Sequence, residues 1–169
     1  LTNNLMYGTL YNESCSHLSH LEFLDVSENG LWFTPCHSLP QLKTLRIVDN
    51  TATMHTSIPL LCQMSPDLQE IDLSGCDISK LALTGGYACP RLENLYLSRT
   101  HLAIDVDAKP WPSVKDLRLD ELKYIYTDEV IYFTSITLVM STFYSPVLER
   151  LDVSSNHIDK IDKEDLLFL

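Results

Sequence analysis

The sequence predicts an α/β solenoid, an arc of short coils with a parallel concave β-sheet of about six to seven short strands and a loop-rich convex side. One motif of spaced apolar residues occurs in six copies along the chain, which begin at Leu21, Leu42, Leu68, Leu92, Val114 and Leu148. The interval between copies is about 24 residues, and such a period is typical of solenoids in which each repeat is one structural unit.

Within each copy, apolar residues occupy the first, fourth, sixth and eleventh positions, and the ninth position is most often polar. The copies are, in order, Leu21, Leu24, Val26, Asn29, Leu31; Leu42, Leu45, Ile47, Asn50, Ala52; Leu68, Ile71, Leu73, Cys76, Ile78; Leu92, Leu95, Leu97, Thr100, Leu102; Val114, Leu117, Leu119, Leu122, Tyr124; Leu148, Leu151, Val153, Asn156, Ile158. The alternation predicts strands over 24–26, 45–47, 71–73, 95–97, 117–119 and 151–153, because alternate side chains share one face of a strand. Such short strands bury that face only by stacking side by side. The motif resembles that of leucine-rich repeat proteins.

The ninth position of each copy predicts a ladder of polar side chains behind the strand ends. An asparagine there can bond backbone groups of its own turn and of the neighbouring turn, which leaves few buried backbone groups unpaired. The predicted ladder comprises Asn29, Asn50, Cys76, Thr100 and Asn156. Cys76 offers a weak thiol donor as a substitute, and Leu122 interrupts the ladder.

We expect residues 1–169 to form a single array, incomplete at both ends, with a long irregular repeat at 114–147. Leu1 to Met6 fit the tail of an earlier copy, and Ile158 to Leu169 fit the beginning of a later one. The chain is therefore expected to be a segment of a larger protein. Its formal charge is -11 with only 12 scattered lysines and arginines, which argues against nucleic acid as a ligand.

Three of the five cysteines, Cys15, Cys36 and Cys62, lie six residues before the first leucine of the following copy. They are thus expected at equivalent places in successive coils, where two readings stay open. In one, the cysteines fill the core as free thiols; in the other, Cys15–Cys36 or Cys36–Cys62 forms a disulfide. No Cys-x-x-Cys or Cys/His cluster indicates a metal site.

Two further features lie between the predicted strands. The sequon Asn12-Glu13-Ser14 is an acceptor for N-glycan in a secreted protein. Residues 130–148 carry no charge, and their serines, threonines and Pro146 favour an excursion of the ectodomain over a membrane span. Either this segment closes over the core, or Ile131, Phe133 and Phe143 line a ligand or partner surface.

The outward residue between the paired apolar positions predicts what the open sheet face presents, namely Asp25, Arg46, Asp72, Tyr96, Arg118 and Asp152. Most of this row reads as a solvated face of alternating charge. Tyr96 and Arg118 are residue types that anchor binding hot spots, so they are the candidates for ligand or partner contact on this face. No nucleophile–base pair, phosphate loop or histidine pair with metal-ligand spacing is present, so we predict no enzymatic activity, cofactor or metal.

The predicted strands read Leu-Asp-Val-Ser at 24–27 and 151–154 and Ile-Asp-Leu-Ser at 71–74. These sequences are similar to those of Toll-like receptor ectodomains. This resemblance implies an innate-immune recognition ectodomain that binds a microbial or protein ligand and signals as a homo- or heterodimer. It also implies the extracellular side of a single-pass membrane protein, at the cell surface or in an endosome, with the membrane span outside this chain. The alternative is an extracellular adhesion or scaffold protein that holds another protein on its concave face.

Overall fold

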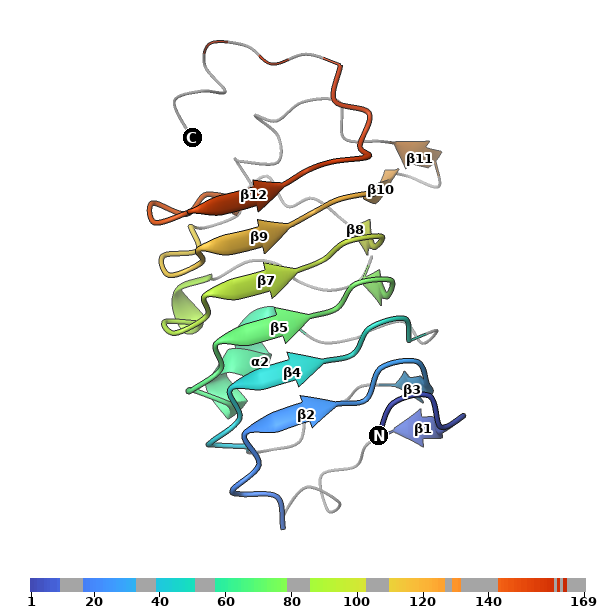
Figure 1. The fold of residues 1–169 in the computed structure, drawn as a ribbon, viewed down its shortest axis with the longest axis vertical. Coiled ribbons are helices and arrows are strands. Elements are labelled where there is room, and N and C mark those ends of the chain that lie inside the picture. Colours follow the sequence, from blue (N-terminus) through green and yellow to red (C-terminus); the bar gives the residue numbers. More distant parts are fainter. Residues whose placement is uncertain are drawn as a thin grey trace.

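The computed structural model describes residues 1–9, 17–32, 39–50, 57–78, 86–102, 110–126, 129–131, 143–159, 161 and 163. Six short parallel strands form one sheet along the concave side of an arc of stacked coils (Figure 1). In order along the stack they are β2 (Phe23–Asp25), β4 (Thr44–Arg46), β5 (Glu70–Asp72), β7 (Asn94–Tyr96), β9 (Asp116–Arg118) and β12 (Arg150–Asp152). The predicted solenoid is therefore confirmed, and each strand lies within one residue of its predicted position.

Short elements form the rest of each coil. The strand β1 (Tyr7–Thr9) pairs in parallel with β3 (Gly30–Trp32). A second small sheet comprises β6 (Asp77–Ile78), β8 (His101–Leu102), β10 (Lys123–Tyr126) and β11 (Glu129–Ile131), in which β11 runs antiparallel to β10. The helix α2 (Ile58–Met64) and the 3₁₀ turn η1 (Gly86–Ala88) are the helical elements of the described residues. Neither is long and apolar enough to cross a membrane.

Helix α2 forms because its first turn is well capped. Ser57 is the N-cap, and its hydroxyl accepts a hydrogen bond from the Leu60 N–H at 3.1 Å. Pro59 stands in the first turn, where a missing N–H costs nothing. Ile58, Leu61 and Cys62 face the core, so the helix closes the coil behind β5.

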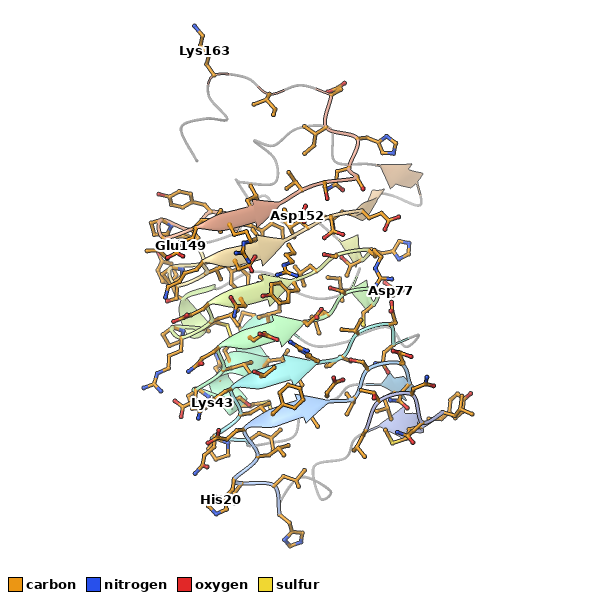
Figure 2. The ribbon with its side chains drawn as sticks, viewed as in Figure 1. His20, Lys43, Asp77, Glu149, Asp152 and Lys163 are labelled. Carbon is orange, nitrogen blue, oxygen red and sulfur yellow. A yellow bond between two sulfur atoms is a disulfide. The ribbon has the colours of Figure 1, made fainter. Side chains whose placement is uncertain are left out.

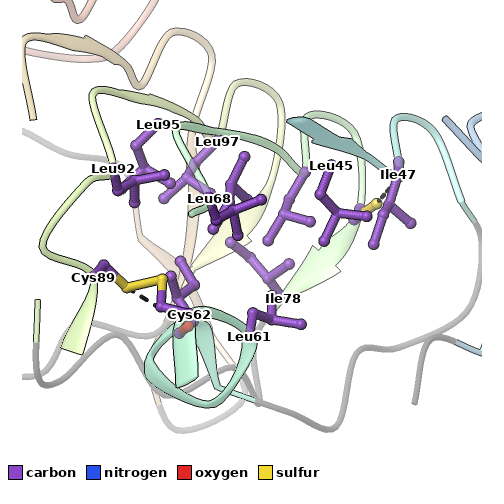
Figure 3. Close-up of a cluster of buried hydrophobic side chains, with 14 of the residues drawn as sticks. Leu45, Ile47, Leu61, Cys62, Leu68, Ile78, Cys89, Leu92, Leu95 and Leu97 are labelled. Carbon is purple, nitrogen blue, oxygen red and sulfur yellow. Dashed lines mark hydrogen bonds between the residues drawn. A yellow bond between two sulfur atoms is a disulfide. The ribbon is translucent and has the colours of Figure 1, made fainter. Parts of the chain in front are cut away.

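The core runs the length of the stack between the sheet and the return segments. The central residues of the six strands are in register with one another, from Leu24 at one end to Leu151 at the other. Most of these side chains and their partners two residues later are fully buried (Figure 3). Each coil therefore contributes one layer to a continuous apolar core, as expected for a solenoid.

The asparagines at the ninth position of the motif tie neighbouring turns together. Asn50 is 2% exposed, its Oδ1 accepts the Leu31 N–H at 3.2 Å, and its Nδ2 donates to the carbonyls of Val26 and Ile47. Asn29 and Asn156 make equivalent bonds to the preceding turn. These side chains satisfy backbone groups that the coil geometry would otherwise leave unpaired.

The substituted positions of the ladder make fewer bonds. The Cys76 thiol donates to the Ile47 carbonyl of the preceding coil at 2.8 Å, and the Thr100 hydroxyl donates only to Leu97 of its own turn at 2.6 Å. The Cys76 thiol also has a hydrogen bond with the Asn50 backbone, whereas Asn50 itself both accepts the Leu31 N–H and donates to two carbonyls. Among the described residues, Thr100 therefore bonds its own turn, whereas Cys76 and the ladder asparagines bond the preceding coil.

A disulfide links Cys62 at the end of α2 to Cys89 just after η1, with a Cα–Cα distance of 5.1 Å (Figure 3). The predicted Cys36–Cys62 bridge is therefore wrong, as is the reading of Cys62 as a free core thiol. The prediction paired equivalent positions, whereas α2 packs against η1 of the next coil and brings together two positions that are not equivalent. Cys15 and Cys36 lie outside the described residues.

Candidate binding surface

The concave sheet presents two outward positions on each strand, one before and one after the buried central residue. Figure 2 shows the side chains that project from this face, with Asp152 on β12 and with Lys43 and Glu149 where the strands begin. The position after the central residue carries Asp25, Arg46, Asp72, Tyr96, Arg118 and Asp152, which the strand register places in one row. The position before it carries Phe23, Thr44, Glu70, Asn94, Asp116 and Arg150 in a second row.

Tyr96 and Arg118, which the sequence indicated as binding candidates, form a stacked pair on β7 and β9. The Arg118 guanidinium carbon lies 4.3 Å from the centroid of the Tyr96 ring. The carboxylate of Asp116 holds both side chains, because its Oδ2 accepts the Tyr96 hydroxyl at 3.3 Å and Arg118 Nη2 at 3.4 Å. Arg150 Nη1 of the next strand donates to the same oxygen at 3.1 Å.

Asp116 is the anchor of this group, since it is only 8% exposed and stands between Tyr96 and two arginines. Its other oxygen, Oδ1, is buried and has no hydrogen-bond partner in the part of the chain that the structure describes. Burial and the nearby Asp116 charge raise the pKa of Tyr96 above its ordinary value. Although burial lowers the pKa of Arg118, the hydrogen bond and charge of Asp116 raise it by more. At neutral pH Tyr96 is therefore a neutral phenol and Arg118 a cation.

A second arginine–aromatic pair occupies the other end of the face. Arg46 on β4 lies over the Phe23 ring of β2 at 5.8 Å and donates from Nε and Nη2 to Glu70 Oε1 at 3.0 and 2.8 Å. The hydrogen bond that Arg46 donates to Glu70 raises the pKa of Arg46. Phe23 is 52% exposed, which is unusual for a phenylalanine in a core-forming strand. Both pairs thus hold an aromatic ring and a guanidinium in place before any partner arrives.

Two shallow cavities lie along the edge where the strands begin. One, of about 460 Å³, is polar and is lined by Glu93, Asn94, Lys115, Asp116, Glu149 and Arg150. The other, of about 510 Å³, includes Pro90, Pro112 and Val147. Both share Glu93 and Lys115, which form an ion pair at 3.2 Å.

The candidates in the uncharged insertion fall elsewhere. Phe143 is fully buried and stacks against Trp111, with 6.5 Å between ring centroids, so its assignment to a ligand surface is wrong. Trp111 and Ser145 occupy equivalent positions in neighbouring coils, three residues before Val114 and Leu148. Because serine is much smaller than tryptophan, Phe143 fills the space beside the indole. Ile131 ends β11. Phe133 and Asn12 lie outside the described residues.

Sequence reasoning missed Phe23, Asp116 and Arg150 as parts of this surface. The signal was present, because side chains alternate along a strand and the residue before each central leucine must face outward with the residue after it. Among the described residues, no group of three or more His, Cys, Asp or Glu side chains could hold a metal ion. What the face offers is a broad polar surface with two immobilised aromatic groups.

A family model described as Leucine Rich repeat matches residues 65–83 and 144–160. These segments contain β5 with β6, and β12 with its ladder asparagine. The comparison thus identifies two leucine-rich repeats in the chain and supports a protein-binding role, since arrays of this kind present extended concave binding surfaces. Comparison with curated proteins and with solved structures gives no match.

Proposed function

We propose that this chain is a protein-binding array whose concave sheet is the contact surface, centred on Tyr96 and Arg118. The observation that carries the proposal is the stack of these two side chains on the carboxylate of Asp116. Tyrosine and arginine are enriched among residues that dominate binding energy. Because both are already held in one geometry, less conformational entropy is lost on binding.

The shape of the surface favours a protein over a small ligand. A small ligand is usually enclosed on most sides, whereas the cavities on the sheet edge are shallow and the sheet itself is open. A partner protein can contact several strands at once along the stack, and the two arginine–aromatic pairs provide anchors for such contact.

The test is a binding screen of the chain against a panel of secreted and cell-surface proteins. We expect Tyr96→Ala to weaken binding of any genuine partner by about tenfold or more, as for a hot-spot residue. The matched control is Tyr87→Ala in η1, which removes a tyrosine away from the sheet; Tyr87 is 61% exposed, whereas Tyr96 is half-buried. Partners that respond equally to both variants would contradict the proposed surface.

We further propose that the array is a ligand-recognition segment of an extracellular receptor of the Toll-like type, which acts by binding a ligand and dimerising. The disulfide between Cys62 and Cys89 supports an oxidising compartment, because such bonds are rare in the cytosol. The similarity of the strand sequences to those of Toll-like receptors supports a receptor of this type over other extracellular leucine-rich repeat arrays. The alternative is an adhesion or scaffold protein that uses the same concave face.

Secretion and stoichiometry separate these possibilities. Expressed behind a signal peptide, the chain is expected to be secreted with Cys62 and Cys89 oxidised, as checked by mass spectrometry of the non-reduced peptides. Sedimentation with a bound partner would show two copies of the chain per complex for a dimerising receptor. One copy per complex would favour the scaffold, and retention of a reduced chain in the cytosol would contradict both.

A further inference from the structure

The concave face carries more negative than positive groups, and the excess is arranged in one row. The outward positions of the six strands hold five carboxylates and three guanidiniums. Glu70 and Asp116 take up all three guanidiniums, through Arg46 in the first case and Arg118 and Arg150 in the second. Asp25, Asp72 and Asp152 are left without an ion-pair partner among the described residues.

These three aspartates occupy the same row as Tyr96. In each of them Oδ1 accepts the backbone N–H of the serine two residues later, at 3.0 Å in every case. This bond fixes the carboxylate on the rim of the strand, and it lowers the pKa of Asp152, with help from Arg118. The row thus presents charged carboxylates in fixed positions.

The row places the tyrosine–arginine stack between two of these carboxylates. Asp72 pairs in register with Tyr96 on one side, and Arg118 pairs in register with Asp152 on the other. Adjacent strands lie about 4.8 Å apart, so three strand spacings separate Asp72 from Asp152 by roughly 14 Å. That span suits two basic side chains of one partner, placed on either side of the aromatic ring.

The sign of the charge decides between possible occupants. The whole chain carries a net charge of -11, so a second copy, an anionic lipid surface or a nucleic acid would be repelled at long range. A basic protein would be steered toward the face, and its cations would find carboxylates that the chain's own arginines leave unpaired. Asp116 is not among these carboxylates, because it is buried and already pairs with Arg118 and Arg150.

We propose that the partner of this face is a basic protein surface whose arginine or lysine side chains bind Asp72 and Asp152 on either side of Tyr96. The inference rests on the proposed function, namely that the concave sheet binds a protein at all. It adds the chemistry of the partner, and it places the specificity in carboxylates that have no ion-pair partner among the described residues.

A library of short randomised peptides displayed on phage tests this directly, with the intact chain as the target. Selected sequences are expected to be enriched in arginine and lysine. The variant Asp72→Asn/Asp152→Asn should weaken their binding by about tenfold or more, because it removes two opposite charges at the contact. Asparagine can still accept the serine N–H, so the turns should keep their geometry.

The control is Asp67→Asn/Asp159→Asn, which changes the net charge by the same amount outside the strands of the concave sheet, at the exposed Asp159 and at the half-buried Asp67 that pairs with Arg91. Its effect on binding should be about twofold or less, as for a long-range charge effect. Equal losses for the two double variants would overturn the proposed site, and so would selection of neutral or acidic sequences.

The outcomes also separate this inference from the proposed function. Neutral or acidic binders that are lost on Tyr96→Ala would overturn the basic partner while leaving the concave face as a binding surface. Binders that ignore both Tyr96→Ala and the Asp72/Asp152 variant would overturn the two proposals together.

Discussion

Replacing Asn50 with alanine is expected to destabilise the solenoid by about 1 to 3 kcal/mol. Alanine removes the acceptor of the Leu31 N–H and the donors to the carbonyls of Val26 and Ile47, bonds of 3.2, 3.1 and 3.2 Å. A buried backbone group left unpaired costs about 1 to 3 kcal/mol. The Leu31 N–H alone is left without its acceptor, because Asn29 Nδ2 still donates to the Val26 carbonyl and the Cys76 thiol still donates to the Ile47 carbonyl, so the expected loss is that of one such group.

The matched control is Asn94→Ala, the same substitution on the open face of β7, where the strand order and register place the side chain away from the core. It should change the free energy of unfolding by about 0.5 kcal/mol or less. Both variants can be measured by urea unfolding followed through tryptophan fluorescence. The sharper readout is hydrogen exchange at the Leu31 amide, which should lose protection in Asn50→Ala alone.

A Leu31 amide that stays protected in Asn50→Ala would refute the reasoning, because the amide would then have found another acceptor or never needed this one. Equal destabilisation by Asn50→Ala and Asn94→Ala would refute it in another way. It would show that the assignment of one position to the core and the other to the open face is wrong.

Three further predictions concern the central coils. Gly75 has φ +74°, and a Cβ there would lie 1.8 Å from Asp49 Oδ1. Gly75→Ala should therefore lower the free energy of unfolding by about 1 to 2 kcal/mol through backbone strain, and by more through the clash with Asp49. Asp49→Ala in the double variant should remove the contribution of the clash alone. Replacing Cys62 and Cys89 with alanine should lower the free energy of unfolding by about 3 to 4 kcal/mol, as expected for a disulfide with a sequence separation of 27. An unchanged melting temperature would contradict this prediction. Burial raises the pKa of Cys76 to about 12, so iodoacetamide at pH 8 should leave it unmodified until the chain unfolds, and rapid alkylation of the native chain would contradict that prediction.

The concave sheet could be predicted from the sequence because its signal is local and repeated. Two apolar residues separated by one position define which side of a strand is buried, and six copies fix the stacking order. The same logic placed Tyr96 and Arg118 on the open face. Only the outward position after each central residue was considered. Asp116 occupies the outward position before it and was therefore missed, although its carboxylate holds Tyr96 and Arg118 in place.

The return segments could not be predicted, because their structure depends on neighbours that the sequence does not mark. Helix α2 forms in one coil, where Ser57 and Pro59 cap it, and it moves Cys62 toward the next coil. An argument from equivalent positions therefore paired the wrong cysteines. Likewise the aromatic content of 130–148 gave no means of telling a binding surface from core, and Phe143 proved to be a core residue packed on Trp111.

The polar ladder, the disulfide and the ion pair between Arg99 and Asp49 all link one coil to another. Where Cys76 replaces the ladder asparagine, its thiol donates to the Ile47 carbonyl and bonds the Asn50 backbone of the preceding coil, and the Cys62–Cys89 bridge joins the same coil to its neighbour. Arg99 reaches Asp49 two coils away at 3.3 Å, across Gly75, whose missing side chain leaves the space for that contact. The covalent bond is independent of salt, whereas an exposed ion pair contributes little and is screened. Reduction of the disulfide should therefore loosen the coils of β5 and β7 first, and these are the coils that carry Asp72 and Tyr96. The stability of the bridge and the geometry of the binding face are thus expected to change together.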